Sequence, residues 1–330
     1  MGDPLPPLTW AAGFTEWTFV PIATAAVLVL AVLYGWGVQR SVRRPGRNWP
    51  WLRTLSFAAG LFVIVVATQS SIGVYEHDLF WIHMVQHLLL IMVAPAFLVA
   101  GRPLILTLHT ASPPVHRRVK RILRSRPVSV LTNPALCVVL YTAVVVLTHL
   151  THIMVTIMAS PLAHGVEELV FLMVGYLYFL PIFGDEPIRW RLSYPMKIIM
   201  LVAAMPVDTF TGLTLIQTNP PLFGMSMTAT DIHNGGAVMW IAGDFIMFAA
   251  MLLVFAVWAS RDSGRVARRG WLEQVRTATF EERFAGRGAA RSASGGPSRT
   301  DLDNDDEQLA AYNDWLADLD RGGSRSSPGS

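Results

Sequence analysis

Histidine and acidic residues recur at helical spacing in the 330-residue sequence. His83 and His87 are four residues apart, and so are His164 and Glu168, so the members of each pair would share one face of a helix. Imidazole and carboxylate groups that adjacent helices present to one another can bind a transition metal between them. These residues therefore predict a metal site.

Methionines suggest which metal the site would take. Imidazole suits zinc, copper, iron and nickel, whereas thioether sulfur selects Cu(I). The methionines expected near the histidines are Met84, Met154, Met158, Met225, Met227 and Met239. They favour copper, as Cu(I). The alternative is haem iron held by His83 or His87 opposite His149 or His152, which are three residues apart. The single cysteine, Cys137, excludes a Cys-x-x-Cys site.

Long apolar segments make up most of the chain and must position these residues. The sequence is 52% hydrophobic and only 15% charged, whereas a soluble domain has about 25% charged residues. A helix crosses a bilayer with about 20 apolar residues and satisfies its own backbone polar groups in lipid. The sequence therefore predicts an all-α integral membrane protein, a bundle of seven transmembrane helices at 18–38, 52–73, 79–100, 130–150, 165–183, 196–217 and 235–260.

Arg and Lys occur only in or beside alternate links between these segments and after the last segment. Because basic links stay in the cytoplasm, the N-terminus is expected outside and the C-terminus inside the plasma membrane of a bacterium. Seven of the nine histidines then fall on the extracytoplasmic side. The expected divisions are an extracytoplasmic segment (1–17), a membrane domain (18–260) and a cytoplasmic tail (261–330). The polar composition of the tail predicts that it is largely disordered.

Three ordered motifs cover about residues 55–260. They are His83-Met-Val-Gln-His87-Leu-Leu-Leu with Ala94-Pro95 and Gly101-Arg102-Pro103; Thr148-His149-Leu150 with His164 and Glu167; and Asp231 with Gly235-Gly236 and Met239-Trp240. Together they resemble the CtaG family of caa3-type cytochrome c oxidase assembly factors. The resemblance implies a non-enzymatic role in building the haem–copper oxidase, with copper delivered to its catalytic subunit I. It also implies ligands at His83, His87, His149, His164 and Asp231.

One position departs from the family pattern. The family tends to have a second histidine where this chain has Glu168, and a carboxylate is a harder ligand than imidazole. Glu168 is therefore expected either to orient His164 or to make this site different, and His233 beside Asp231 could compensate. The candidate metal ligands are His83, His87, His149, His152, His164, Glu168, Asp231 and His233.

Other functions remain open at this stage. A haem-binding electron carrier would use the paired histidines, a di-metal oxygenase would need them on the cytoplasmic side, and an ion or metal transporter could use Asp208 within span six. The expected partners are oxidase subunit I and membrane lipid. Nucleic acid is not expected, because the basic residues lie in loops without interleaved aromatic residues.

Overall fold

The structure, a computed structural model, describes residues 9, 12–43, 48–184, 186–218 and 228–288. The chain divides into two compact units, Met1–Ser260 and Arg261–Ser330. The described residues are helical and contain no strand. The helices are α1 (Ala12–Thr15), α2 (Pro21–Val42), α3 (Trp51–Gln69), α4 (Ser71–Tyr75), α5 (Phe80–Leu88), a π-helical turn (Leu89–Val93), α6 (Ala94–Ala100), α7 (Pro103–Thr110), α8 (Pro113–Leu123), α9 (Arg126–Leu131), α10 (Pro134–Leu150), α11 (Ile153–Met158), α12 (Pro161–Phe183), α13 (Tyr194–Gln217) and α14 (Ala229–Gly288).

Six helical segments in this described part are long and apolar enough to cross a bilayer, so the chain is a multi-pass membrane protein. They are Pro21–Val42, Trp51–Tyr75, Phe80–Thr110, Pro161–Phe183, Tyr194–Gln217 and Ala229–Arg261. Each contains most of one predicted apolar segment. The predicted seventh, 130–150, corresponds to α10, which is apolar but has 17 residues. The seven-span count and the N-out, C-in orientation therefore stay predictions.

Local sequence explains why α10 is short. Val130 and Leu131 belong to α9, and the chain turns before α10 begins. The Asn133 side chain then accepts hydrogen bonds from the backbone N–H groups of Ala135 and Leu136, at 3.0 and 3.3 Å. A capping Asn followed by Pro in the first turn is a strong helix start, because Pro has no N–H to leave unsatisfied.

The tail differs in part from the expectation of disorder. α14 continues beyond the apolar segment to Gly288, so residues 261–288 are helical. The rest of the predicted tail, 289–330, lies outside the described residues.

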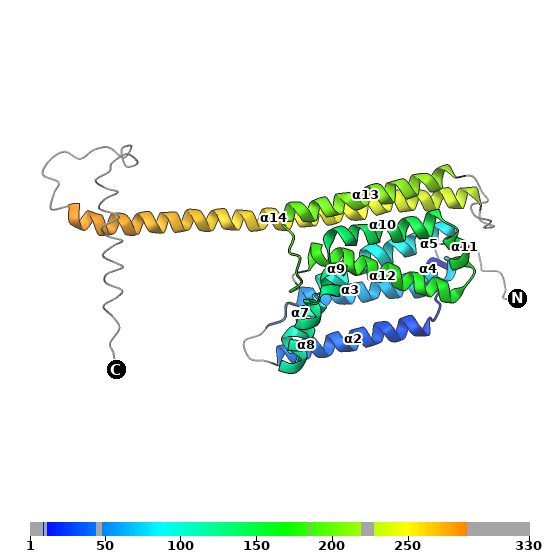
Figure 1. The fold of residues 1–330 in the computed structure, drawn as a ribbon, viewed down its shortest axis with the longest axis horizontal. Helices are drawn as coiled ribbons and strands as arrows, with labels where there is room; N and C mark the ends of the chain where they lie inside the picture. The colour runs from blue at the N-terminus through cyan, green and yellow to red at the C-terminus, as the bar shows by residue number, and fades with distance from the viewer. Residues whose placement is uncertain (1–8, 10–11, 44–47, 185, 219–227, 289–330) are drawn as a thin grey trace. The chain divides into compact units, whose positions relative to one another are not determined.

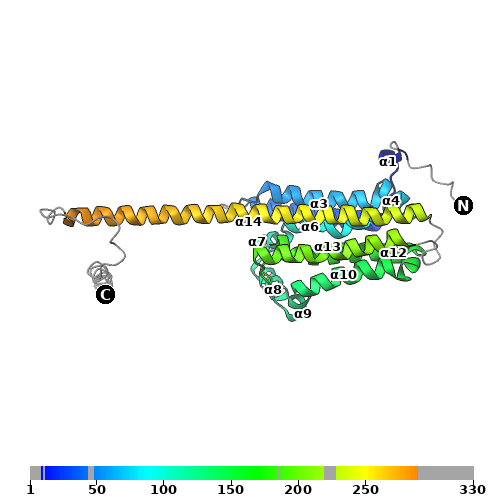
Figure 2. The ribbon, with the colours of Figure 1, turned by 90° about the horizontal axis from the view of Figure 1, so that it is seen from above.

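In the first unit, α4 lies at one end of the bundle and α7 and α8 at the other (Figures 1 and 2). α12 occupies a central position, because it packs against α6, the π-helical turn and α10. α2 is peripheral and contacts α3 and α7. Among the helices that carry predicted ligands, α5 leads directly into the π-helical turn against which α12 packs, and α12 also packs against α10, so these three lie close together inside the bundle.

The close contact between α12 and the third span depends on one glycine. The π-helical turn follows α5 directly, and Pro95 comes just after it. A π-helical turn widens the helix locally and is frequent near functional sites. A Cβ atom on Gly175 would overlap the carbonyl oxygen of Ile91 and would come within 2.7 Å of Pro95 Cγ. Only glycine therefore lets the two helices approach this closely.

Asp231 fixes the start of α5. Its Oδ2 accepts a hydrogen bond from Phe80 N at 2.7 Å, and its Oδ1 one from Trp81 N at 3.4 Å. These N–H groups have no partner inside the helix, and a carboxylate at a helix N-terminus is also favoured by the helix dipole. Gly235, one turn later, makes room for the Phe80 ring, which a Cβ atom there would overlap. Asp231 and Gly235 thus hold α14 against the helix that carries His83 and His87.

The capping role predicts the effect of replacing Asp231. Asp231→Ala should lower the free energy of unfolding by about 1 kcal/mol, the usual cost of a lost N-terminal cap, while metal content stays at the wild-type level. Thermal unfolding and metal analysis of the protein in detergent would measure both. Asp231→Asn is the matched control, because Asn caps helices about as well as Asp. Loss of metal with unchanged stability would instead identify Asp231 as a ligand.

Candidate metal centre

Four buried side chains from two helices converge into what we term the inner cluster: His83 and His87 of α5, and His164 and Glu167 of α12. One possible ligand atom of each lies within 4.8 Å of the others. The ring centroids of His83 and His87 are 4.1 Å apart, and those of His83 and His164 are 5.4 Å apart. All four residues are at most 4% exposed. Spacings of four and three residues put each pair on one helix face.

The inner cluster leaves many polar atoms unsatisfied. Within the described residues, both ring nitrogens of His83, Nε2 of His87, Nε2 of His164 and both carboxylate oxygens of Glu167 are buried without a hydrogen-bond partner. Each buried unsatisfied polar group costs about 1–3 kcal/mol, and most buried polar atoms in proteins are paired. A concentration of such atoms around one point fits a bound cation, which would accept a lone pair from each.

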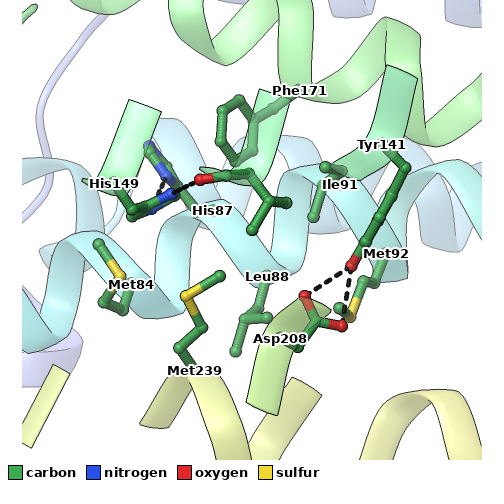
Figure 3. A pocket seen from close by; sticks show the side chains of 11 residues that line it. Met84, His87, Leu88, Ile91, Met92, Tyr141, His149, Phe171, Asp208 and Met239 are labelled. Carbon is green, nitrogen blue, oxygen red and sulfur yellow. Dashed lines mark hydrogen bonds between the residues drawn. The ribbon is translucent and has the colours of Figure 1, made fainter. Parts of the chain in front are cut away.

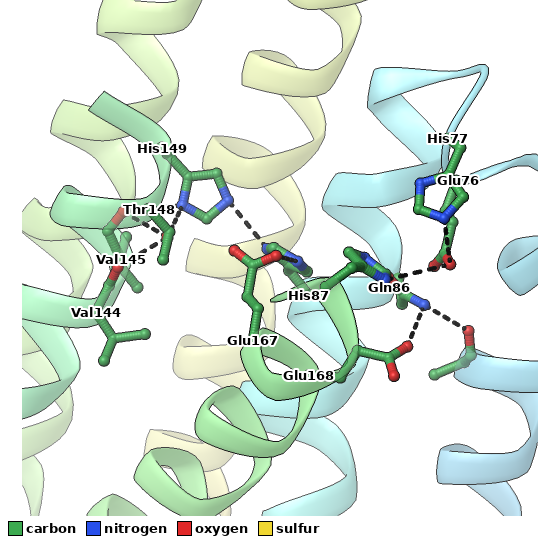
Figure 4. Close-up of polar contacts among 12 residues, drawn as sticks. Glu76, His77, Gln86, His87, Val144, Val145, Thr148, His149, Glu167 and Glu168 are labelled. Carbon is green, nitrogen blue, oxygen red and sulfur yellow. Dashed lines mark hydrogen bonds and ion pairs between the residues drawn. The ribbon is translucent and has the colours of Figure 1, made fainter. Parts of the chain in front are cut away.

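His149 of α10 orients His87 (Figure 4). His149 Nδ1 lies 2.8 Å from the carbonyl oxygen of Val145, so this nitrogen must carry the proton of the neutral ring. His149 Nε2 is then an acceptor, and His87 Nδ1, 3.1 Å away, donates to it. The proton on His87 Nδ1 leaves a lone pair on Nε2, the nitrogen that faces Glu167 at 3.5 Å. A ligating histidine commonly donates its other N–H in this way, so the geometry makes His149 a positioning residue.

Glu168 lies away from the inner cluster. Its Oε1 accepts a hydrogen bond of 2.8 Å from Gln86 Nε2, which also donates to the carbonyl oxygen of Ala67 at 3.2 Å. Gln86 is fully buried, so this link ties α5 to both α12 and α3. Glu168 therefore orients Gln86. The sequence had led us to expect that Glu168 would either bind the metal or orient His164.

The remaining predicted ligands also lie elsewhere. Asp231 caps α5, as described above. His233 Nε2 is 3.3 Å from the carbonyl oxygen of Thr218. His152 is exposed and is the N-cap residue of α11. Of the eight predicted ligands, the structure thus brings together His83, His87 and His164, with His149 beside them.

Two acidic residues join the site although spacing did not single them out. Glu167 takes the place beside the histidines that was expected for Glu168. Glu76, in the link between α4 and α5, approaches His164 Nδ1 with its Oε1 at 3.6 Å. Burial, with the nearby negative charges of Glu168 and Glu167, raises the pKa of Glu76 to about 9, despite an opposing contribution from Gln86. The sequence offered one signal for Glu76, because this residue lies in an acidic link just before the helix that carries His83 and His87.

A narrow cavity adjoins His87 and His149, and two of the predicted methionines line it (Figure 3). Met84 and Met239 point into it from α5 and α14. Asp208 lines the same cavity, and both of its oxygens accept from the Tyr141 hydroxyl, at 3.0 and 3.1 Å. This bond ties α13 to α10. Met225 and Met227 lie outside the described residues.

The chain has relatives of greater length. It is 30% identical over 339 residues to an uncharacterized protein of Mycobacterium bovis and to one of Mycobacterium tuberculosis, matching 97% of this chain and 47% of each relative. An uncharacterized protein of Mycobacterium leprae is 27% identical over 325 residues, matching 93% of this chain and 45% of the relative. The chain therefore spans about half the length of these curated relatives. No solved structure gives a significant match.

A family model covers most of the apolar helices and all of the residues of the inner cluster. The model is that of the cytochrome c oxidase caa3 assembly factor, and it matches residues 32–261. The matched segment includes each of the three sequence motifs, from His83 to Trp240. The chain belongs to the caa3 cytochrome c oxidase assembly factor family.

Proposed function

We propose that this protein is a non-enzymatic assembly factor that binds copper in the inner cluster and passes it to subunit I of a haem–copper oxidase. The observation that carries the proposal is the group of buried imidazole and carboxylate atoms that have no hydrogen-bond partner among the described residues. The family of the chain, that of a cytochrome c oxidase caa3 assembly factor, connects this site to the oxidase. Copper is the cargo of this protein, so the site has to hold the ion and also release it.

The donor set supports copper. Three imidazoles suit copper as well as zinc and iron, and thioether sulfur favours Cu(I). Met84 and Met239 line the cavity beside His87, so soft donors are available next to the imidazoles. Glu167 supplies a negative charge that offsets the charge of the ion. Exchange of one neutral ligand for another would let the ion move between these groups.

The packing of the histidines argues against the haem alternative. The rings of His83, His87, His149 and His164 contact one another in sequence, with centroids 4.1 to 5.4 Å apart. A porphyrin would have to lie between two of them, and the side chains leave no such space.

The transport alternative has no specific support in the structure. The hydrogen bond from Tyr141 to Asp208 gives Asp208 a role in holding α13 to α10.

The location of the site supports delivery outside the cytoplasm. α4 and the start of α5 lie at the end of the bundle opposite the basic helix α8 (Figure 1). Basic segments stay in the cytoplasm, so the inner cluster would lie toward the extracytoplasmic side. Subunit I of the oxidase would then receive copper from that side of the membrane.

Metal analysis tests the copper site. Protein purified in detergent after growth with copper should contain stoichiometric copper, and the His83→Ala/His87→Ala variant should contain none, because two of the ligands are gone. Mass spectrometry of copper, zinc and iron would measure this. His109→Ala/His116→Ala is the matched control, since it removes two histidines that lie on α7 and α8, away from the inner cluster. Stoichiometric zinc or iron in place of copper would contradict the assignment.

Oxidase maturation tests the delivery step. In a strain that lacks this protein, the purified oxidase should be deficient in copper, and the wild-type gene should restore it. The His83→Ala/His87→Ala variant should fail to restore it, although the variant protein is present in the membrane. An oxidase with full copper content in the deletion strain would refute the role.

A further inference from the structure

A second group of metal-binding side chains lies at the rim of the site. Glu76, His77 and His164 each offer a ligand atom within 4.8 Å of the other two, and we call them the rim trio. His77 Nε2 and His164 Nδ1 lie 3.8 and 3.6 Å from the same carboxylate oxygen of Glu76. The rings of His77 and His164 are in edge contact, with centroids 4.9 Å apart. Figure 4 shows His77 and Glu76 on the side of Gln86 away from His149.

The rim trio connects solvent to the buried site. The His77 side chain is 47% exposed, whereas those of Glu76 and His164 are 8% and 5% exposed. Within the described residues, Glu76 Oε2 and His164 Nε2 are buried without a hydrogen-bond partner. A carboxylate oxygen and an imidazole nitrogen thus lie unused directly behind an exposed imidazole, which is an arrangement that can receive a cation from water.

His164 belongs to both groups. On one side it contacts His77 and Glu76, and on the other its ring lies 5.4 Å from that of His83. Each neighbouring pair of rings from His77 through His164, His83 and His87 has centroids between 4.1 and 5.4 Å apart. An ion could therefore move inward by exchanging one imidazole for the next, without passing through water or lipid.

We propose that the rim trio is a capture site, where copper ions first bind before His164 hands them to the inner cluster. The inference rests on the proposed copper function, which it deepens. In this proposal His77 affects only the rate at which copper is loaded, because its ring contacts His164 and not His83 or His87. His164 is the shared ligand, and Glu76 supplies a carboxylate oxygen at the rim, which releases its proton when the ion binds.

Transfer of Cu(I) from a coloured chelator to the full-length protein in detergent, followed by absorbance under anaerobic conditions, tests the capture site. His77→Ala should slow the transfer on the order of tenfold, as expected for loss of one group beside a metal, and should leave the final copper content unchanged. Glu76→Gln, which keeps the shape of the side chain, should also slow it. Asp78→Ala is the matched control, because Asp78 is exposed in the same link and belongs to neither group.

The outcomes separate the two proposals. Loading of His77→Ala at the wild-type rate would overturn the capture site and leave the copper function intact. A lower final copper content in His77→Ala would also overturn it, because His77 would then be a ligand of the stored ion. Failure of the wild-type protein to take up any copper would overturn both proposals together.

Discussion

Metal-free His83→Leu protein should be more stable than metal-free wild-type protein. His83 is fully buried, and within the described residues neither ring nitrogen has a hydrogen-bond partner. Leucine has a similar volume and removes these unsatisfied groups, each of which costs about 1–3 kcal/mol. The free energy of unfolding without metal should therefore rise. Copper should stabilise the wild-type protein and have no effect on the variant, because ligand binding stabilises only a protein that binds the ligand.

Thermal unfolding in detergent, with and without Cu(I), measures both effects. His116→Leu is the control, because its ring Nδ1 lies 2.8 Å from the carbonyl oxygen of Leu108 and this contact would be lost. This control should lose stability and keep its response to copper. If His83→Leu destabilises the metal-free protein, then His83 serves the fold, and the unsatisfied nitrogens do not mark a metal site.

The lengths of the apolar segments predicted the helices of the site, because the length of an apolar segment is a local property of the sequence. His83 and His87 were paired correctly, since residues four apart share a helix face whatever the helix packs against. The choice between Glu167 and Glu168 was different. Both are compatible with a helix face that includes His164, and they differ by about 100° of rotation around the axis. Only the packing of α12 against α5 and α10 turns Glu167 toward the histidines.

The roles of Asp231 and His149 could not be predicted for a related reason. Asp231 meets the start of α5 because Gly235 lets α14 approach Phe80, and no local pattern encodes this contact between segments distant in the chain. His149 was expected to be a ligand, yet its role depends on which of its nitrogens faces Val145. Local spacing thus identified the pair of His83 and His87, while tertiary contacts decided which other residues join them and what each one does.

Gly175→Leu should prevent the correct packing of α12 and abolish copper binding. The added side chain would overlap the Ile91 carbonyl and the Pro95 ring, and neither backbone nor proline ring can move aside as a flexible side chain would. Overpacking a buried contact typically costs about 1–3 kcal/mol, and sometimes more. The same displacement would move His164 and Glu167 on α12 away from His83 and His87. Gel filtration, thermal unfolding and copper content of the purified variant would measure the effect.

Gly165 offers a matched control on the same helix. A Cβ atom there meets nothing within 4 Å, and replacing glycine in a helix interior gains about 1 kcal/mol in helix propensity. Gly165→Leu should therefore keep or raise the stability and keep the copper, although it makes the same chemical change one residue after His164. Because the two substitutions are predicted to act with opposite sign, equal losses in both would show that α12 tolerates no leucine for reasons unrelated to the contact at Ile91. A loss confined to Gly175→Leu would show that the inner cluster depends on how closely α12 approaches the π-helical turn.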